Sequence, residues 1–149
     1  MTRKQKLVEV LPRMMWLIEG FCLYWFAYKG IPAIFPTTLR AVIGTLVLLA
    51  GTSILLDSLR CLTKAMFTKE LVTSGVYGFM RHPMYVGMHG MLAGIGILFF
   101  DWHWLAVLVV LLPAWPIIAH IEEWQMTGLY PQEHPAYKQK TGMFLPKLR

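Results

Sequence analysis

A basic residue followed by a histidine, and a pair of adjacent acids, are the side chains of this sequence best suited to chemistry. Arg81, His82 and Pro83 stand directly before a long apolar run. Proline is favoured at the first position of a helix, where its missing N–H costs nothing, so His82 is a candidate N-cap. The free N–H groups that follow, with Arg81 beside them, would attract a carboxylate or a phosphate. The alternative is that Arg81 meets only lipid headgroups and His82 only caps.

The acids Glu122 and Glu123 follow the last apolar run of the chain. Two adjacent carboxylates are unfavourable at a helix C-terminus and beside hydrocarbon, so we expect a cation to compensate them. A salt bridge to Arg81 or Lys69 would do so. A ligand that carries an ammonium or a sulfonium would suit the two acids equally well.

Other polar residues within apolar surroundings are weaker candidates for a functional or metal-binding role. Glu19 lies inside the first apolar run, where a carboxylate either has a function or reaches polar groups of neighbouring helices. The five histidines of the sequence do not form the His-x-x-His-His clusters of a membrane di-iron site. His89 and His120 are expected at different depths, which disfavours haem ligation. We therefore predict no metal site.

Four apolar runs must position these side chains. They span residues 11–28, 39–59, 85–100 and 104–121, in a chain that is 56% apolar and 15% charged. A helix needs about 20 apolar residues to cross ~30 Å of hydrocarbon, so the third and fourth runs are slightly short. The pattern predicts an all-α integral membrane bundle of four transmembrane helices, forming one domain over residues 1–149. Gly90 and Gly94 form a Gly-x-x-x-Gly pattern that predicts close helix packing.

The connections between the runs differ in length and in charge. Residues 101–104 allow only a tight hairpin, and residues 29–36 carry Gly30, Pro32 and Pro36, which predict a loop. Twelve Lys and Arg residues fall on one side of the predicted membrane and two, Lys29 and Arg40, on the other. The positive-inside rule then places both termini and the connection between residues 60 and 81 in the cytoplasm, with the basic N-terminus acting as a signal anchor.

The positions of the basic residues and of the cysteines argue against nucleic-acid binding and against a disulfide. The formal net charge is +6, but its residues are dispersed between apolar runs, which argues against nucleic-acid binding. Cys22 and Cys61 are expected at opposite depths of the bundle, so no disulfide is predicted.

The segment from residue 71 to residue 87 closely resembles a signature of the isoprenylcysteine carboxyl methyltransferase and phospholipid methyltransferase superfamily. That signature is Gly-Pro-Tyr followed by Arg-His-Pro-x-Tyr-x-Gly. Here it reads Gly75-Val-Tyr77 and then continues from Arg81 to Gly87. A second signature, in residues 122–146, is a Glu-Glu pair followed by a tyrosine and a terminal proline. Two linked motifs in the right order are more specific than either one alone.

The resemblance implies S-adenosylmethionine as the cofactor, held on the cytoplasmic side, covered by a C-terminal helix and open sideways to a lipid-like or prenylated substrate. His82 and Tyr85 would contact the cofactor together with Arg81. The backbone of Gly75, Val76 and Tyr77 would line its adenosine. Glu122 or Glu123 would hold its amino group or ribose.

Three positions depart from the family pattern: Pro131 stands in place of Gly, His134 in place of Tyr, and Met143 in place of an Arg. That Arg is expected to orient a substrate carboxylate, so its absence weakens the prenylcysteine assignment. A carboxylate acceptor needs no base at neutral pH, whereas an amine or a thiol needs one. The candidate catalytic residues are His134, Glu123 and Tyr137.

The sequence does not identify the methyl acceptor, which is a prenylated cysteine, a phospholipid amine, a small thiol or another lipid. The oligomeric state is also unknown. Two other functions compete with methyl transfer. Sterol-reductase-like enzymes that use NADPH share a similar Arg-His-Pro-x-Tyr region, but usually carry Arg and Asp where this chain has Glu122 and Glu123. A non-catalytic membrane scaffold could also retain the fold.

Overall fold

The computed structural model describes residues 3–29, 37–68, 70–99 and 102–147. Its described part is all-α, and the only pairing outside helices is a single bridge between Met80 and Gly142. This confirms the all-α part of the predicted fold class, while the bundle of four transmembrane helices stays a prediction. The helices are α1 (Arg3–Lys29), α2 (Thr37–Thr68), the 3-10 helix η1 (Gly75–Gly78), α3 (Pro83–Phe99), α4 (Trp102–Leu111), α5 (Ala114–Leu129) and α6 (Glu133–Lys140).

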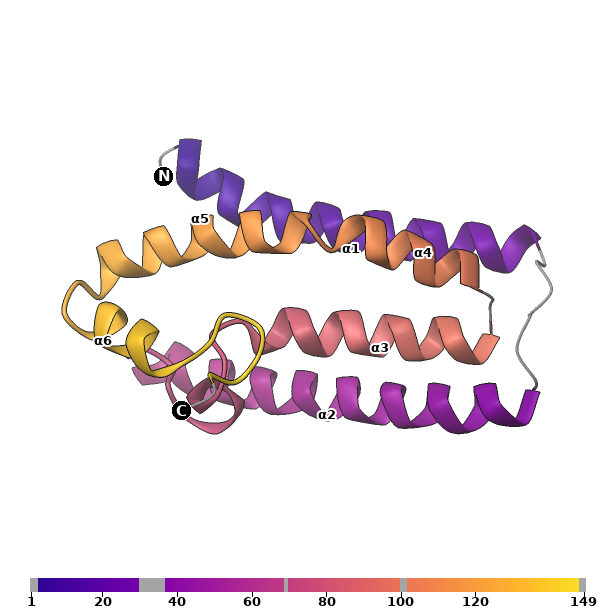
Figure 1. Cartoon of the computed structure of the whole chain (residues 1–149). Coiled ribbons are helices and arrows are strands. Elements are labelled where there is room, and N and C mark those ends of the chain that lie inside the picture. Colours follow the sequence, from indigo (N-terminus) through magenta and orange to yellow (C-terminus); the bar gives the residue numbers. More distant parts are fainter. Residues whose placement is uncertain (1–2, 30–36, 69, 100–101, 148–149) are drawn as a thin grey trace.

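The long helices lie roughly parallel to one axis (Figure 1). Helices α2 and α3 run side by side in opposite directions, and α1 lies along α4 and α5. One end of the bundle gathers the start of α1, the end of α2, η1, the start of α3, the end of α5, and α6. These are the ends that the count of basic residues predicts to be cytoplasmic. The side of the membrane itself stays a prediction.

Large apolar side chains cover the outer faces of the long helices. Examples on α1, α2 and α4 are Leu17, Leu46 and Val110, which are 72%, 62% and 76% exposed. Among the described residues, one helix, Thr37–Ala65 within α2, is both long and apolar enough to cross a membrane, and α3 is apolar but has only 17 residues. The number of spans is therefore still a prediction, while the exposed apolar surface is typical of a protein in contact with lipid.

Close packing of α2 against α3 depends on glycines from both helices. A methyl group at Gly94 would lie 2.5 Å from the backbone nitrogen of Leu48, and one at Gly87 would lie 2.6 Å from that of Leu55. The Gly-x-x-x-Gly prediction is thus confirmed, and the contact extends one turn further at Gly87. At the opposite end of the bundle from α6, the guanidinium of Arg40 donates to the carbonyls of Ile97 and Leu98, both at 3.0 Å. These bonds satisfy carbonyls that the end of α3 leaves free.

The fourth apolar run does not form one helix, so the prediction of a continuous helix over residues 104–121 was wrong. It divides into α4 and α5 around Leu112 and Pro113. Pro113 and Pro116 have no N–H to donate, and each ring obstructs the carbonyl four residues earlier. The N–H of Trp115 bonds instead to the carbonyl of Leu112 at 3.3 Å, which is a tighter turn than the α-helix makes.

The end of this run also differs from the prediction. Helix α5 continues to Leu129, so Glu122 and Glu123 lie inside the helix and not at its C-terminus. The terminal dipole therefore does not oppose them, and their compensation must come from side chains. The predicted loop over residues 29–36 falls largely outside the described residues. Of the predicted hairpin over residues 101–104, residue 101 lies outside them and residues 102–104 form the start of α4.

The glycine contact gives a test of the fold. A methyl group at Gly51 would lie 2.4 Å from the backbone nitrogen of Met91, whereas one at Gly20 meets nothing within 4 Å. We expect Gly51→Ala to lower the free energy of unfolding by about 1–3 kcal/mol, because the two backbones must separate. Gly20→Ala should leave it unchanged or raise it by up to about 1 kcal/mol. Thermal unfolding in detergent measures both, and equal effects of the two variants would contradict this packing.

Candidate active site

The segment that precedes α3 is held in place by α2. The carboxylate of Asp57 accepts the N–H of Val76 at 2.9 Å. Gly75 adopts a positive φ of 60°, and a side chain there would meet Asp57 and the sulfur of Cys61, each at 2.7 Å. Glycine is required at this position both by its conformation and by the space. Asp57 was not among the predicted site residues, although a single acid within an apolar run is a visible signal.

The two signature motifs, distant in sequence, are joined at the backbone. The N–H of Arg81 donates to the carbonyl of Gly142 at 2.9 Å, and the N–H of His82 donates to the carbonyl of Met143 at 3.0 Å. The hydroxyl of Tyr137 donates to the carbonyl of Tyr77 at 2.6 Å. The C-terminal segment and α6 therefore lie directly on the start of α3. Tyr137 acts as a structural contact in this arrangement.

Arg81 lies at the centre of the site, with a side chain that is only 11% exposed. Its Nε donates to Oε1 of Glu123 at 2.6 Å. Its terminal nitrogen donates to the carbonyls of Lys138 and Thr141. The ammonium of Lys138 lies 2.7 Å from Oε2 of the same carboxylate. The predicted cation beside Glu123 is thus Arg81, with Lys138 as a partner that the sequence analysis missed; Lys69 lies outside the described residues.

His82 stands between the two acids. Its Nδ1 is 3.4 Å from Oε2 of Glu122, and its Nε2 is 3.4 Å from Oε1 of Glu123. The carbonyl of His82 accepts the N–H of Val86, so its backbone takes the N-cap position while its side chain turns to the acids. The hydroxyl of Tyr85 donates to Glu122, and its ring stacks on His82 with centroids 5.6 Å apart.

The charges of this cluster shift the pKa values of its members. Burial alone would lower the pKa of His82, but hydrogen bonds and charges from Glu122 and Glu123 outweigh burial and raise it. Burial would raise the pKa of Glu123, but its contacts with His82, Lys138 and Arg81 hold it far below the ordinary value. Burial raises the pKa of Tyr137 to about 12, so this phenol stays protonated at neutral pH.

His134 lies beside the cluster, on α6. It is 2% exposed, and its Nδ1 is 2.9 Å from the hydroxyl of Thr127. Burial lowers the pKa of His134, so the imidazole is neutral near pH 7 and one ring nitrogen is able to accept a proton.

Two cavities adjoin the cluster. The first, which we call the polar cavity, has a volume of about 300 Å³. Its lining combines charged, aromatic and aliphatic residues: Leu62, Ala65, Glu70, Leu71, Val72, Tyr77, Arg81, His82, Glu123, Met126, Leu129, Tyr130, His134 and Tyr137. Most of the predicted site residues are thus brought together here. Four predicted cofactor residues, Gly75, Val76, Tyr85 and Glu122, are not among the lining residues, and Glu70 and Tyr130 are additions to the prediction.

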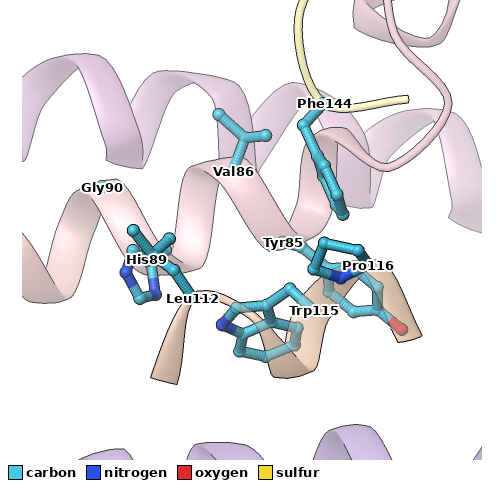
Figure 2. Close-up of a pocket in the computed structure, with 8 residues that line it drawn as sticks. All are labelled: Tyr85, Val86, His89, Gly90, Leu112, Trp115, Pro116 and Phe144. Carbon is cyan, nitrogen blue, oxygen red and sulfur yellow. The ribbon is translucent and has the colours of Figure 1, made fainter. Parts of the chain in front are cut away.

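The second cavity, which we call the apolar cavity, has a volume of about 380 Å³ and lies between α3 and α5 (Figure 2). Its lining residues are Tyr85, Val86, His89, Gly90, Leu112, Trp115, Pro116 and Phe144. His82 borders the polar cavity and Tyr85 the apolar one, so this stacked pair stands where the two meet. Among the described residues, no group of three His, Cys, Asp or Glu side chains is arranged to hold a metal ion.

Comparison with known proteins identifies one related family. The model of the phospholipid methyltransferase family matches residues 39–133, which include α2, α3 and the Glu122–Glu123 pair. No curated protein and no solved structure gives a significant match.

The raised pKa of His82 predicts how the stability of the cluster depends on pH. His82 binds its proton more tightly in the folded protein than in the unfolded chain, where the pKa of histidine is ordinarily 6.5. Protonation of His82 therefore stabilises the fold, and the whole contribution is present below that pKa. This contribution is lost as the pH rises through the raised pKa of the folded state. The melting temperature of the wild type should therefore exceed that of His82→Gln most below pH 6.5, with the difference shrinking at alkaline pH. His120→Gln, at an exposed position, is the control, and a pH-independent effect of His82→Gln would contradict the assignment.

Proposed function

Because the chain belongs to the phospholipid methyltransferase family, whose members are integral membrane methyltransferases, we propose that it transfers a methyl group from S-adenosylmethionine to a membrane-partitioned acceptor. One observation carries the proposal: Arg81, His82 and Glu123 line a polar cavity, while Tyr85, which donates to Glu122 of the same cluster, lines an apolar cavity. A polar donor and an apolar acceptor would meet at such a junction.

The polar cavity fits the chemistry of the cofactor. Glu123, Arg81 and His82 all line this cavity, so it offers a carboxylate to an ammonium group and cationic donors to a carboxylate, although Glu123 and Lys138 already form an ion pair there. The aliphatic lining residues, which include Leu62, Leu71 and Val72, suit the faces of an adenine ring. A volume of about 300 Å³ is within the usual range for small-molecule sites. When bound, S-adenosylmethionine supplies an activated methyl group on a sulfonium.

The protein has little covalent chemistry to perform in such a displacement. Its contribution is to position the acceptor in line with the methyl group and to exclude water. Helix α6 contributes to both, since His134 and Tyr137 line the polar cavity and Tyr137 bonds back to the carbonyl of Tyr77. The anionic pair Glu122 and Glu123 lies beside the region where the positive charge of the sulfonium would be held. His134, neutral at pH 7, would accept a proton at this end of the site.

The apolar cavity is the proposed site for the acceptor. Apart from Tyr85 and His89, its lining consists of apolar residues, which suits a hydrocarbon chain entering from the membrane. The cationic side chains of Lys140 and Lys147 do not line either cavity, and the ammonium of Lys147 donates to the carbonyl of Gln139 at 2.8 Å. Neither lysine takes the place of the family's carboxylate-orienting Arg.

The first test is cofactor binding. Calorimetry of the detergent-purified protein should detect S-adenosylhomocysteine binding, and Glu123→Gln should weaken it at least about ten-fold, because the carboxylate that would hold the ammonium is lost. Glu122→Gln should have a smaller effect. Glu133→Gln, on the exposed face of α6, is the matched control. Absence of binding at high micromolar ligand would refute methyl transfer, and wild-type affinity in both site variants would favour a scaffold or a different site.

The second test concerns the acceptor. Met143 packs against the buried cluster that contains Tyr85 and Trp115, next to the apolar cavity. We predict that farnesylated cysteine analogues are weak acceptors, and that Met143→Arg increases their methylation because it restores a bidentate carboxylate partner. Transfer of label from a methyl-labelled cofactor, followed by mass spectrometry of lipid extracts, measures this. Strong wild-type turnover of such an analogue, unaffected by Lys140→Ala and Lys147→Ala together, would show that the inference is wrong.

A further inference from the structure

A carboxylate and an imidazole meet inside the bundle, away from the charged cluster. Glu19 of α1 is 0% exposed, and its Oε1 lies 3.2 Å from Nδ1 of His89 on α3. Its second oxygen, Oε2, is buried without a hydrogen-bond partner. A carboxylate within apolar surroundings is costly unless it is paired, and one that is kept there is a functional candidate. The pair therefore calls for an explanation beyond tying two helices together.

His89 connects this pair to the apolar cavity. It lines one end of the cavity, while Phe144 and Pro116 lie at the other (Figure 2). Tyr85 is the other lining residue with an ionisable group, and its hydroxyl already donates to Glu122. His89 is thus the lining residue best able to take up a proton from a bound molecule.

Unpartnered donors surround the same region. The indole N–H groups of Trp16 and Trp115 are buried without a partner. Trp115 belongs to the buried cluster that borders the cavity, and Trp16 packs against that cluster. Buried polar groups are nearly always hydrogen-bonded, so several unpartnered ones in one region indicate a place for a polar group of a ligand or for water.

The spacing along α3 relates His89 to the charged cluster. His82, Tyr85 and His89 follow one another at intervals of three and four residues, which places them on one face of the helix. With a rise of 1.5 Å per residue, His89 is about 10 Å deeper than His82. The ring of Trp115 lies against both Tyr85 and His89, with centroids 4.7 and 6.3 Å away. The apolar cavity is thus lined both by Tyr85, which bonds to the charged cluster, and by the imidazole of His89.

We infer that His89, held by Glu19, is the base that removes a proton from the methyl acceptor, and that the acceptor is an amphiphile whose reacting amine or thiol carries that proton. The inference rests on the proposed function. A carboxylate only accepts hydrogen bonds, so in this arrangement Nδ1 of His89 donates to Glu19 and Nε2 keeps the lone pair. His89 is then a catalytic residue and Glu19 a positioning residue.

The step balances without any further reactant. The proton of the acceptor's ammonium group or thiol passes to Nε2 of His89. The freed lone pair of the nitrogen or sulfur forms a bond to the methyl carbon, and the electron pair of the broken carbon–sulfonium bond stays on the cofactor sulfur. A carboxylate acceptor has no proton to give, and the buried charge of Glu19 disfavours an anion in the same apolar region.

Ligand binding to the cofactor-free protein tests the class of acceptor without any turnover. The probes are hexylamine, hexanethiol and hexanoate, added to protein in nanodiscs of zwitterionic lipid and followed by tryptophan fluorescence, since Trp115 lines the cavity. We expect the amine and the thiol to bind at least about ten-fold more tightly than the carboxylate. Glu19→Gln should reduce this preference to less than about three-fold, whereas Glu133→Gln should preserve it. Equal binding of all three probes to the wild type would overturn the inference.

Kinetics test the role of His89 itself. His89→Gln should lower kcat for amine or thiol methylation about 100-fold with little change in KM or in the affinity for S-adenosylhomocysteine, because a general base is lost. His120→Gln is the matched control, and mass spectrometry of the product tells amine from thiol. If Glu19→Gln does not fold, Glu19→Asp retains the charge but withdraws it from Nδ1, and kcat should fall about ten-fold.

The outcomes separate the two proposals. A wild type that does not bind S-adenosylhomocysteine refutes the proposed function. A wild type that binds it and turns over, with kcat of His89→Gln or of Glu19→Asp within about three-fold of the wild-type value, refutes only the inference.

Discussion

The α6 end of this protein depends on the ion pair and the hydrogen bonds that the guanidinium of Arg81 makes. It reaches Glu123 on α5, the carbonyl of Lys138 on α6 and the carbonyl of Thr141 beyond it. A buried cation must be fully compensated, and removal of one partner of such a pair typically costs about 3–5 kcal/mol. The planar guanidinium offers several donors in fixed directions, which a lysine at this position would not. One side chain therefore fixes the positions of three segments relative to the start of α3.

The polar end is in turn positioned by apolar packing. Because α2 and α3 approach through glycines, their backbones leave little freedom to slide or rotate. Asp57, on α2, then holds the N–H of Val76, and this contact places η1 directly before Arg81 and His82. The polar groups at the end of the bundle are thus held by elements whose own contacts are almost entirely between apolar surfaces. Such preorganisation is what a displacement reaction requires of a protein.

Local patterns in the sequence predict the helices and part of the charged cluster, but they miss contacts and a helix break that depend on the folded chain. The apolar runs predict the helices, because each run reflects one stretch of buried or lipid-facing backbone. The compensation of Glu123 by Arg81 follows from the cost of an unpaired acid. Lys138 was missed because its proximity to Glu123 depends on how α6 folds back over the site. The apolar pattern does not predict the break at Pro113, because a run long enough to span a membrane is typical of one continuous helix, and only the two prolines indicate an interruption. The pairing of Glu19 with His89 joins residues 70 positions apart, which no local pattern shows.

The glycine contact between α2 and α3 also limits which positions of the chain can change during evolution. Exposed apolar positions such as Leu17, Leu46 and Val110 meet no fixed neighbour, so any residue of similar hydropathy serves there and substitutions can accumulate freely. At Gly51, Gly87 and Gly94 the neighbour is backbone, which no compensating side-chain change can move out of the way. Sequences within this lineage would therefore diverge quickly on the outer apolar surface and slowly at the glycines between α2 and α3. Hydrophobicity alone does not predict this difference, because the outer residues are the more hydrophobic ones.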